Sequence, residues 1–320
     1  MPLTPSLSPS DGERVAEGRV RGFLVPIRKF ILATVPGSAD GHNMQRRLRN
    51  IKHVALDMDG TIYKGGMLFA STAPFLATLR ELGIGYTFLT NNPSRNVTDY
   101  LAHLHKLGIP AIDEQLYTST QATIEYLREK WPAVRRLFAL GTPSMSEQFT
   151  SAGFVLVPDD HHEAPDAVVV GFDTNLSYAR LCRAAWWIQQ GKPYFATNPD
   201  RVCPTDEPTV LVDCGSICAA LEAATGRAPM AVMGKPDPNM LRSILQRHTL
   251  APENLAMVGD RLYTDIMMAH HAGVLGVLVL TGEATAAEAA RFSPAPDLIV
   301  SGLEEFGALL RAAKEDVVPK

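Results

Sequence analysis

The chain has 320 residues, of which 46% are hydrophobic and 20% are charged, which is enough apolar material for about two ordinary domains with sizeable cores. Its 30 basic and 34 acidic side chains give a formal net charge of −4, which argues against the strongly basic surface of a nucleic-acid-binding protein. The 4 cysteines lack C-x-x-C spacing and are too few for a disulfide scaffold, and no apolar run reaches the ~18 residues of a membrane-spanning helix, so we expect a soluble, cytoplasmic protein.

Residues 1–43 differ in composition from the rest of the chain. They are rich in Pro, Ser, Gly and Arg, and they show no sustained helical or strand periodicity. We therefore expect a disordered extension that ends at residue 43.

From residue 51 onward, short apolar runs alternate with amphipathic segments, as in β-α units around a mostly parallel sheet. The first series predicts a strand, a helix, a strand and a helix over residues 54–56, 71–82, 86–90 and 94–107. Each predicted helix begins at a Ser that can cap it, and each ends before a Gly that can leave the helical conformation. The local signals in this part of the chain agree with one another.

A second series of strands and helices follows, over residues 137–140, 144–152, 167–170, 178–190, 194–196 and 219–224. The alternation then resumes with strands over 230–233, 255–258 and 274–280 and a terminal helix over 303–313. This pattern predicts an α/β fold with a doubly wound, Rossmann-like parallel-sheet core and two domains, one inserted in the other. Periodicity alone does not show the insertion, because both stretches look α/β.

Asp57 and Asp59, in the sequence D-M-D-G-T, come directly after the first predicted strand. Open α/β sheets bind ligands at the carboxyl ends of their strands, so both carboxylates are expected at a reactive edge. A turn at Gly60 can bring them to one centre, which a Mg²⁺ ion would stabilise. The alternative is a strand that ends in a solvated acidic turn. An EF-hand is excluded, because its loop needs Gly at the sixth position and an acid at the twelfth.

Three further polar groups follow predicted strands: T-N-N at 90–92, G-K-P at 234–236 and G-D-R-L-Y-T-D at 259–265. The first offers a hydroxyl and free N–H groups before a helix, which suit phosphate oxygens. The second offers a lone cation and the third a second pair of acids. Taken singly, each has an ordinary interpretation as a capping turn, a surface Lys or a helix cap. Together they would gather at one edge of a sheet.

With these four motifs the sequence resembles the haloacid dehalogenase superfamily of phosphohydrolases. Within it the chain is similar to the class-two capped group (subfamily IIA), which includes p-nitrophenyl phosphatase, phosphoglycolate phosphatase, and sugar, nucleotide and pyridoxal phosphate phosphatases. T-N-P-D at 197–200 and C-G-S at 214–216 also resemble signatures of this group. The resemblance covers residues 51–314, and residues 1–43 match nothing in it.

The resemblance implies a core interrupted by a large α/β cap. We accordingly expect a first core part, an inserted cap and a second core part over residues 44–130, 131–229 and 230–320. It also implies a Mg²⁺-dependent phosphatase that hydrolyses phosphate monoesters of small metabolites through an aspartyl-phosphate. A phosphotransferase or phosphomutase on the same core, or a noncatalytic phosphate-responsive binding module, remains an alternative.

By resemblance, Asp57 is the nucleophile, and Asp59 is the acid-base that protonates the leaving alkoxide and then activates water. The implied Mg²⁺ ligands are a carboxylate oxygen of Asp57, the backbone carbonyl of Asp59 and Asp260, with Asp265 orienting them. A small phosphorylated metabolite is the implied partner, without nucleic acid or membrane, and a homodimer is conceivable. The physiological substrate stays open at this stage.

The remaining implied contacts are with phosphate and with the junction between cap and core. Thr90, Asn91 and Lys235 would hold the phosphoryl oxygens, with Lys235 compensating charge in the transition state and Gly60 adding a backbone donor. The residues expected at the junction, close to the substrate, are Asn92, Asn198 and Asp200.

Overall fold

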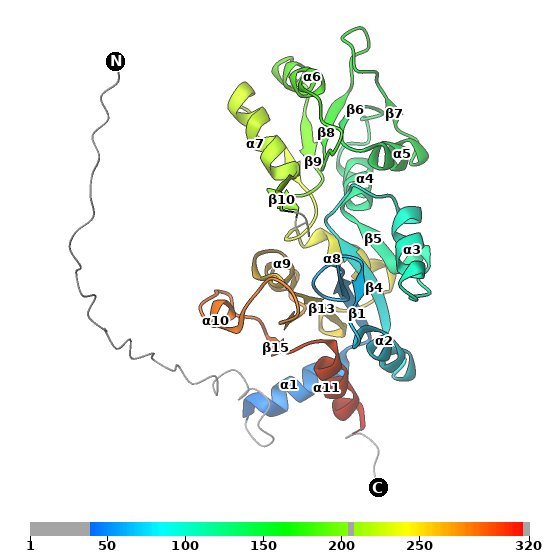
Figure 1. Ribbon diagram of the computed structural model, residues 1–320, viewed down its shortest axis with the longest axis vertical. Helices are drawn as coiled ribbons and strands as arrows, with labels where there is room; N and C mark the ends of the chain where they lie inside the picture. Colours follow the sequence, from blue (N-terminus) through cyan, green and yellow to red (C-terminus); the bar gives the residue numbers. More distant parts are fainter. Residues whose placement is uncertain (1–38, 204–207, 316–320) are drawn as a thin grey trace, which may run out of the picture.

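The computed structural model describes residues 39–203 and 208–315, and within them the larger of two main sheets has six parallel strands in the order β15-β14-β13-β1-β4-β5 (Figure 1). Their bounds are β1 (His53–Asp57), β4 (Gly85–Thr90), β5 (Leu116–Thr118), β13 (Leu255–Gly259), β14 (Leu275–Val279) and β15 (Leu298–Val300). From β1 the chain runs outward to β5, and it later returns beside β1 at β13 and runs outward to β15. The strand order therefore reverses between β1 and β13, and such a reversal is where open α/β sheets bind ligands.

Helices cover both faces of this sheet, because alternate residues of each strand point to opposite sides. Val54 and Leu56 of β1 pack into a cluster with residues of α1, α2 and α11, whereas Ala55 packs into a cluster with residues of α8 and α9. The fold class predicted from the sequence is confirmed. The helices around the larger sheet are α1 (Ala39–Asn50), α2 (Thr72–Glu81), α3 (Val97–Lys106), α4 (Ser119–Lys130), α8 (Asn239–Arg247), α9 (Met267–Ala272), α10 (Ala286–Ala289) and α11 (Leu303–Glu315).

Helix α1 corrects the expected extension. The extension was predicted to end at residue 43, but α1 already begins at Ala39 and lies beside α11 (Figure 1). Met44 and Leu48, one turn apart, are both buried in the core cluster. The composition of residues 1–43 hid this start, because a helix that buries only one narrow stripe has little apolar signal in its first turn. Residues 1–38 lie outside the described part.

The smaller main sheet is also parallel, with the order β12-β9-β8-β6-β7. Its strands are β6 (Arg136–Leu140), β7 (Val155–Leu156), β8 (Ala167–Val170), β9 (Tyr194–Ala196) and β12 (Ala231–Val232), with helices α5 (Pro143–Ser151), α6 (Tyr178–Gln189) and α7 (Cys214–Thr225). Helices α6 and α7 cover one face, and α5 with part of α4 covers the other. The chain enters this unit after β5 and leaves it before β13, so it is an inserted α/β cap.

The strand expected over residues 230–233 was assigned to the core, and that assignment is wrong. It corresponds to β12, which pairs with β9 of the cap sheet through Ala231 and Val232. A strand of two residues carries no pattern that could reveal which sheet it joins, and this explains the error. The return to the core therefore follows β12 rather than preceding it.

Helix α3 begins later than the sequence predicts. The helix expected from Ser94 begins at Val97, because Asn96 caps it and forms a reciprocal capping box with Asp99.

No helix of the described residues is long and apolar enough to cross a membrane. The remaining elements are the hairpins β2 (Tyr63–Lys64) with β3 (Met67–Leu68) and β10 (Val202–Cys203) with β11 (Leu211–Val212), 3₁₀ turns at Asp113–Gln115 and Pro252–Asn254, and a π-helical turn at Leu262–Ile266.

If α1 is part of the core, then Leu48→Ala should lower the free energy of unfolding by about 2 to 5 kcal/mol, because it leaves a cavity beneath the helix. Urea denaturation of the full chain measures this change. Arg46→Ala, on the exposed side of the same helix, is the matched control and should change stability by less than about 0.5 kcal/mol. A Leu48→Ala protein as stable as its control would show that α1 does not contribute to the core.

Candidate active site

The polar residues singled out in the sequence meet at the carboxyl edge of the larger sheet. Asp57 ends β1, Thr90 ends β4, Asp260 follows β13, and Lys235 follows β12 at the return from the cap. A pocket of about 400 Å³ lies there, and it is lined by core residues such as Asp57, Asp59 and Thr90 and by cap residues such as Phe172 and Asp200. The pocket is therefore bounded by both units of the chain.

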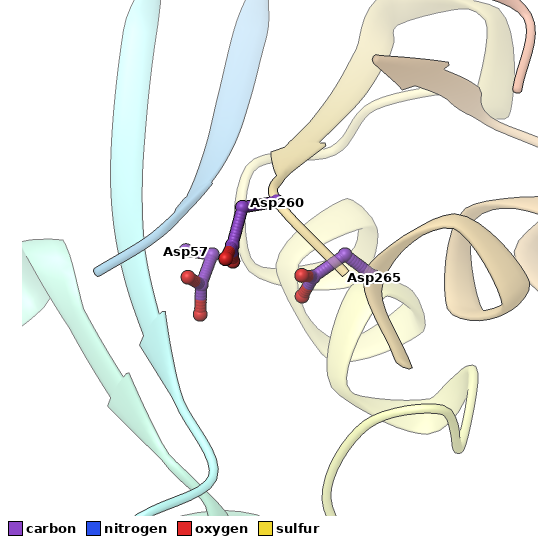
Figure 2. A group of neighbouring side chains, drawn as sticks. All are labelled: Asp57, Asp260 and Asp265. Atoms are coloured by element: carbon purple, nitrogen blue, oxygen red, sulfur yellow. The ribbon is translucent and has the colours of Figure 1, made fainter. Parts of the chain in front are cut away.

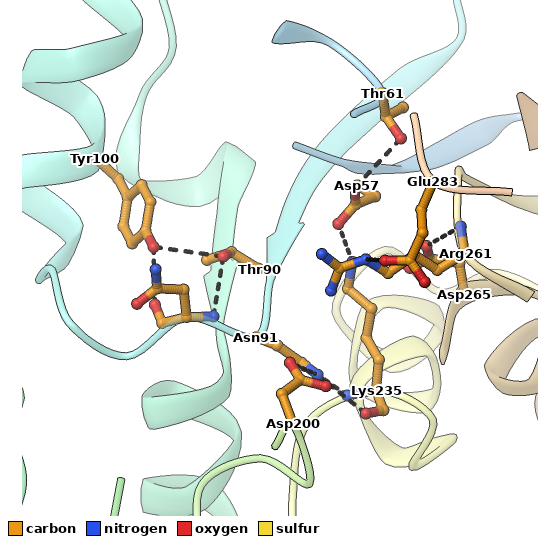
Figure 3. Close-up of polar contacts among 11 residues, drawn as sticks. Asp57, Thr61, Thr90, Asn91, Tyr100, Asp200, Lys235, Arg261, Asp265 and Glu283 are labelled. Atoms are coloured by element: carbon orange, nitrogen blue, oxygen red, sulfur yellow. Dashed lines mark hydrogen bonds and ion pairs between the residues drawn. The ribbon is translucent and has the colours of Figure 1, made fainter. Parts of the chain in front are cut away.

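Lys235 is the centre of the charge arrangement. Its ammonium group contacts the Asp57 carboxylate, 178 positions away in sequence, and lies 2.8 Å from Oδ1 of Asp265 (Figure 3). Only 3% of Lys235 is exposed. Burial alone would lower the pKa of Lys235, but the charges of Asp265 and Asp57 outweigh burial, so its pKa lies above the ordinary value. Lys235 is therefore a permanent cation at this site.

Three carboxylates, those of Asp57, Asp260 and Asp265, have oxygens within 4.8 Å of one another (Figure 2). Burial, together with the charges of Asp57 and Asp265, raises the pKa of Asp260 to about 8. Burial also raises the pKa of Asp265, to about 6, against the opposing effect of Lys235. One lysine does not neutralise three acids, so the site has room in its charge balance for a divalent cation.

The Asp260 carboxylate lies in a tight cradle. Its Oδ2 accepts a hydrogen bond from the backbone N–H of Glu283 at 2.7 Å, while its Oδ1 is buried without a hydrogen-bond partner among the described residues. A Cβ atom at Gly60 or Gly282 would lie 2.4 Å or 1.9 Å from Oδ2. Two glycines therefore leave room for this carboxylate, and one of its buried oxygens is unsatisfied.

Asp57 and Asp59 flank the turn that follows β1. The hydroxyl of Thr61 donates to Oδ2 of Asp57 at 3.2 Å, and the side chain of Asp59 is exposed at the pocket. Gly60 has φ +86°, a conformation that glycine adopts without strain, and its N–H donates to the carbonyl of Tyr63 at 2.7 Å. The N–H of Gly60 is therefore engaged within the turn, which does not support the expectation that it binds phosphate.

Thr90 and Asn91 of the T-N-N turn have different contacts. Thr90 lines the pocket, and its hydroxyl accepts from the N–H of Asn92 at 3.2 Å and lies 3.4 Å from the hydroxyl of Tyr100. The Asn91 side chain instead accepts from the N–H of Lys235 at 2.7 Å and donates to its carbonyl at 3.0 Å and to Asp200 at 3.1 Å. The side-chain amide of Asn91 thus connects three segments, which does not support the expectation that this amide binds phosphate.

The residues expected at the junction differ in their access to the pocket. Asn198 is fully buried, donates to the carbonyl of Asn91 at 3.0 Å, and accepts from the N–H of Asp200 at 2.9 Å. Asp200 and Asn92 line the pocket, and Asn92 also donates to the thiol of Cys203 at 3.7 Å. Burial raises the pKa of Asp200. Asn198 therefore holds the junction together from inside, whereas Asp200 and Asn92 face the pocket.

Sequence reasoning missed several residues of the pocket. Arg261 follows Asp260 directly in the motif at 259–265, and the sequence predicts no role for it. It lines the pocket, and its Nε lies 3.0 Å from Oε2 of Glu283. Its position beside Asp260 was the available signal. Arg95, His103 and Phe172 also line the pocket, and nothing in their local sequence separates them from ordinary surface or core residues.

Two family models match the chain. A family model described as haloacid dehalogenase-like hydrolase matches residues 54–155, and a second, described as HAD-hydrolase-like, matches residues 232–306. The first matched range contains Asp57 and Thr90, and the second contains Lys235, Asp260 and Asp265.

Relatives with assigned activities are similar over most of the chain. The acid sugar phosphatase of Staphylococcus saprophyticus is 31% identical over 258 residues, which is 81% of this chain and 97% of that protein. The crystal structure of 4-nitrophenylphosphatase from Thermotoga maritima aligns with a TM-score of 0.77 and 39% identity, over 82% of this chain and 98% of its own. The glycerol phosphate phosphatase of Mycobacterium tuberculosis in complex with magnesium aligns with a TM-score of 0.75 and 31% identity, over 81% and 77%.

In protein freed of divalent metal, stability should fall between pH 5 and pH 8. The pKa of Asp260 is raised to about 8 and that of Asp265 to about 6, so the folded state holds more protons than the unfolded state in this range, and raising the pH favours unfolding. Asp260→Asn carries no charge, so it should flatten this fall and should stabilise the metal-free protein at pH 8 by roughly 1 kcal/mol or more.

Urea denaturation with a chelator present, at pH 5, 6.5 and 8, measures the effect. Asp113→Asn, at an exposed position that does not line the pocket, is the control and should keep the slope of the parent chain. An Asp260→Asn protein with the same slope as this control would contradict the assignment.

Proposed function

The chain belongs to the haloacid dehalogenase-like hydrolases and is a phosphatase of phosphoric monoesters, and we propose that it hydrolyses small phosphorylated metabolites in two steps with Asp57 as the nucleophile. The observation that carries the proposal is the placement of Asp57. Its carboxylate stands at the end of β1, in a pocket between core and cap, in contact with the buried cation Lys235.

In the first step a carboxylate oxygen of Asp57 attacks phosphorus, and the bond from phosphorus to the ester oxygen breaks. The product is an aspartyl-phosphate, and the proton needed by the departing alkoxide comes from Asp59. In the second step water attacks the same phosphorus, and Asp59 accepts the proton from that water. Inorganic phosphate leaves and the Asp57 carboxylate is restored. Two easier displacements thereby replace one very slow hydrolysis.

The location of Asp59 suits an acid-base role. Its side chain is exposed at the pocket, two residues beyond Asp57 on the same turn. Lys235 contacts the carboxylates of Asp57 and Asp265. The two carboxylates of the D-x-D motif therefore have different surroundings, as different roles require.

The acidic cluster fits Mg²⁺. Asp57 and Asp260 would hold the ion, because Oδ1 of Asp260 is buried without a partner among the described residues and hard oxygen ligands suit Mg²⁺. Asp265 fits the orienting role expected for it, because its oxygens already meet Lys235 at 2.8 Å and the N–H of Arg261 at 3.1 Å. Bound there, Mg²⁺ would supply positive charge to the phosphoryl oxygens and to the Asp57 carboxylate.

The phosphoryl oxygens have three further donors in the proposal. Lys235 and Arg261 provide charge beside Asp57, and Thr90 provides a hydroxyl at the end of the neighbouring strand. Donors fixed before the reaction stabilise the charge that develops in the transition state without reorganising. The side chain of Asn91 supports Lys235 by bonding the backbone of that lysine. The N–H of Gly60, which the sequence predicts as a phosphate donor, has no role in this proposal.

The cap completes the site by covering the leaving group. Phe172 and Asp200 bring an aromatic ring and a carboxylate from the cap against the core acids. Enclosure reduces access of bulk water to the aspartyl-phosphate and selects the alcohol that departs.

A noncatalytic binding module has no need for a nucleophile and an acid in one pocket. A phosphate-release assay with and without Mg²⁺ distinguishes such a module from an enzyme. Transfer of the phosphoryl group to an added alcohol would identify a phosphotransferase.

The two acids should differ sharply in rapid-mixing experiments with p-nitrophenyl phosphate. Asp59→Asn should release about one p-nitrophenolate per site in a burst and then turn over very slowly, because nitrophenolate leaves without an acid but the second step lacks its base. Asp57→Asn should show no burst and should lose about 10⁴-fold or more of the turnover. Glu114→Gln, at an exposed position outside the pocket, is the control. A burst from Asp57→Asn would refute the nucleophile assignment.

Gly282→Ala should weaken Mg²⁺ binding without unfolding the protein. Its Cβ would lie 1.9 Å from Oδ2 of Asp260, so the carboxylate must move out of its cradle. We expect at least a 10-fold increase in the Mg²⁺ concentration for half-maximal activity, with a parallel loss of affinity in calorimetric titration of the metal alone. Gly66→Ala, where a Cβ would meet nothing within 4 Å, is the matched control. Unchanged affinity in Gly282→Ala would place the metal away from Asp260.

A further inference from the structure

Arg95 is a cation of the pocket that the proposed reaction does not use. It lies between β4 and α3 and lines the pocket. Among the residues that the structure describes, its guanidinium makes no hydrogen bond or ion pair, and its backbone carbonyl accepts a hydrogen bond from Gln148 at 3.2 Å. Arg261 of the same pocket is instead paired with Glu283 at 3.0 Å. An arginine that lines a pocket without a carboxylate partner is suited to bind a carboxylate of a ligand.

Arg95 lines the same pocket as Asp59 and Tyr63, and Asp59 and Tyr63 adjoin each other through a backbone bridge. His103 of α3 lies close to Arg95 and Asp59: burial lowers the pKa of His103, Arg95 lowers it further, and Asp59 raises it. The His103 ring also meets the ring of Tyr63 edge-on, with 5.2 Å between centroids. Tyr63, His103 and Arg95 thus form the core-side wall that continues from Asp59, where the leaving oxygen is protonated.

The phosphoryl end of the pocket already has its own cations. Lys235 contacts Asp57, and the charge of Asp57 is a leading cause of the raised pKa of Arg261. Arg95 exerts its electrostatic effect on Tyr63, Tyr100 and His103 instead. Arg95 lines the pocket together with Tyr63, which adjoins Asp59, the acid that serves the departing alcohol in the proposed reaction.

We propose that Arg95 selects phosphate monoesters whose leaving group carries a carboxylate, which its guanidinium binds while Asp59 protonates the ester oxygen. This inference rests on the proposed function and names the substrate class for that same site. The planar guanidinium matches the two oxygens of a carboxylate and can donate to both at once.

The acids on the cap side favour a carboxylate over a second phosphate. Asp213 lines the pocket and caps α7 by accepting from the N–H of Cys214, and Asp200 accepts from Asn91. Burial raises the pKa of Asp213 to about 6 and also raises that of Asp200, so both are less acidic than free carboxyls. They would nevertheless repel a dianionic phosphate more strongly than a singly charged carboxylate.

Matched substrates test the inference directly. 3-Phosphoglycerate and glycerol 3-phosphate differ only by a carboxylate in place of a neutral CH₂OH group. We expect the parent chain with Mg²⁺ to favour 3-phosphoglycerate at least 10-fold in kcat/KM. Arg95→Gln should raise KM for 3-phosphoglycerate about 10- to 100-fold with little change in kcat, since a remote binding contact is lost. For glycerol 3-phosphate its KM should stay within about 3-fold of the parent value.

Two further variants separate recognition from general damage. Arg95→Lys keeps the charge but not the planar fork, and it should recover part of the preference for 3-phosphoglycerate. Arg135→Gln removes a charge from another exposed arginine that does not line the pocket, and it should leave both substrates unaffected. Equal losses for both esters in Arg95→Gln would overturn the proposed recognition.

p-Nitrophenyl phosphate distinguishes failure of this inference from failure of the proposed function. If the parent chain hydrolyses p-nitrophenyl phosphate but shows no Arg95-dependent preference for 3-phosphoglycerate, the inference is overturned and the phosphatase mechanism stands. If 1,3-propanediol bisphosphate is preferred over 3-phosphoglycerate in an Arg95-dependent way, the carboxylate assignment is overturned. No hydrolysis of p-nitrophenyl phosphate with Mg²⁺ would overturn the proposed function and this inference with it.

Discussion

The contact between Lys235 and the carboxylates of Asp57 and Asp265 is the interaction on which the rest of the site depends. Three acids with oxygens within 4.8 Å of one another repel, and burial increases that repulsion because little water screens it. The buried ammonium group of Lys235 offsets part of this repulsion. The remaining negative charge favours a divalent cation, and that cation together with Lys235 would supply the positive charge that a phosphoryl group requires. The larger sheet makes this possible by bringing the ends of β1 and β13 side by side.

Lys235 also links the candidate active site to the position of the cap relative to the core. Lys235 follows β12 by only a few residues, and β12 belongs to the cap sheet. Between them Gly234 has φ +80°, and a Cβ there would lie 2.7 Å from Oδ1 of Asn91. The Asn91 side chain bonds both the N–H and the carbonyl of Lys235, and it also bonds Asp200 of the cap. A displacement of the cap would therefore act on the position of the cation beside the nucleophile. In this arrangement enclosure of the substrate and alignment of Lys235 are linked through one amide.

Much of the fold and of the candidate site could be predicted from the sequence. Each motif follows a strand, and parallel strands present their carboxyl ends at one edge of the sheet. Asp57, Thr90 and Asp260 are predictable in this way, and so is Lys235 once the resemblance is recognised. The errors have physical reasons. The side chain of Asn91 and the N–H of Gly60 look like open donors in sequence. A tertiary contact with Lys235 occupies the first, and a bond within its own turn occupies the second. Strand β12 is too short to reveal its sheet, and α1 begins within a segment whose composition resembles an extension. Phe172 of the cap lines the pocket because the cap packs against the core, which no local sequence pattern shows.

The pocket also explains how one fold can keep its chemistry while its substrate changes. In the proposed reaction Lys235, Arg261 and the three clustered acids surround phosphorus. They come from strand ends, from the loops that follow and, for Asp265, from the π-helical turn. In the proposal Arg95, His103 and Phe172 face the leaving group. They come from the loop between β4 and α3, from α3 and from the cap. Substitution in the second group leaves the charge balance of the first intact, because Arg95 makes no ion pair with any described acid of the site. Selection of the alcohol can therefore vary at Arg95 and its neighbours without disturbing the attack by Asp57.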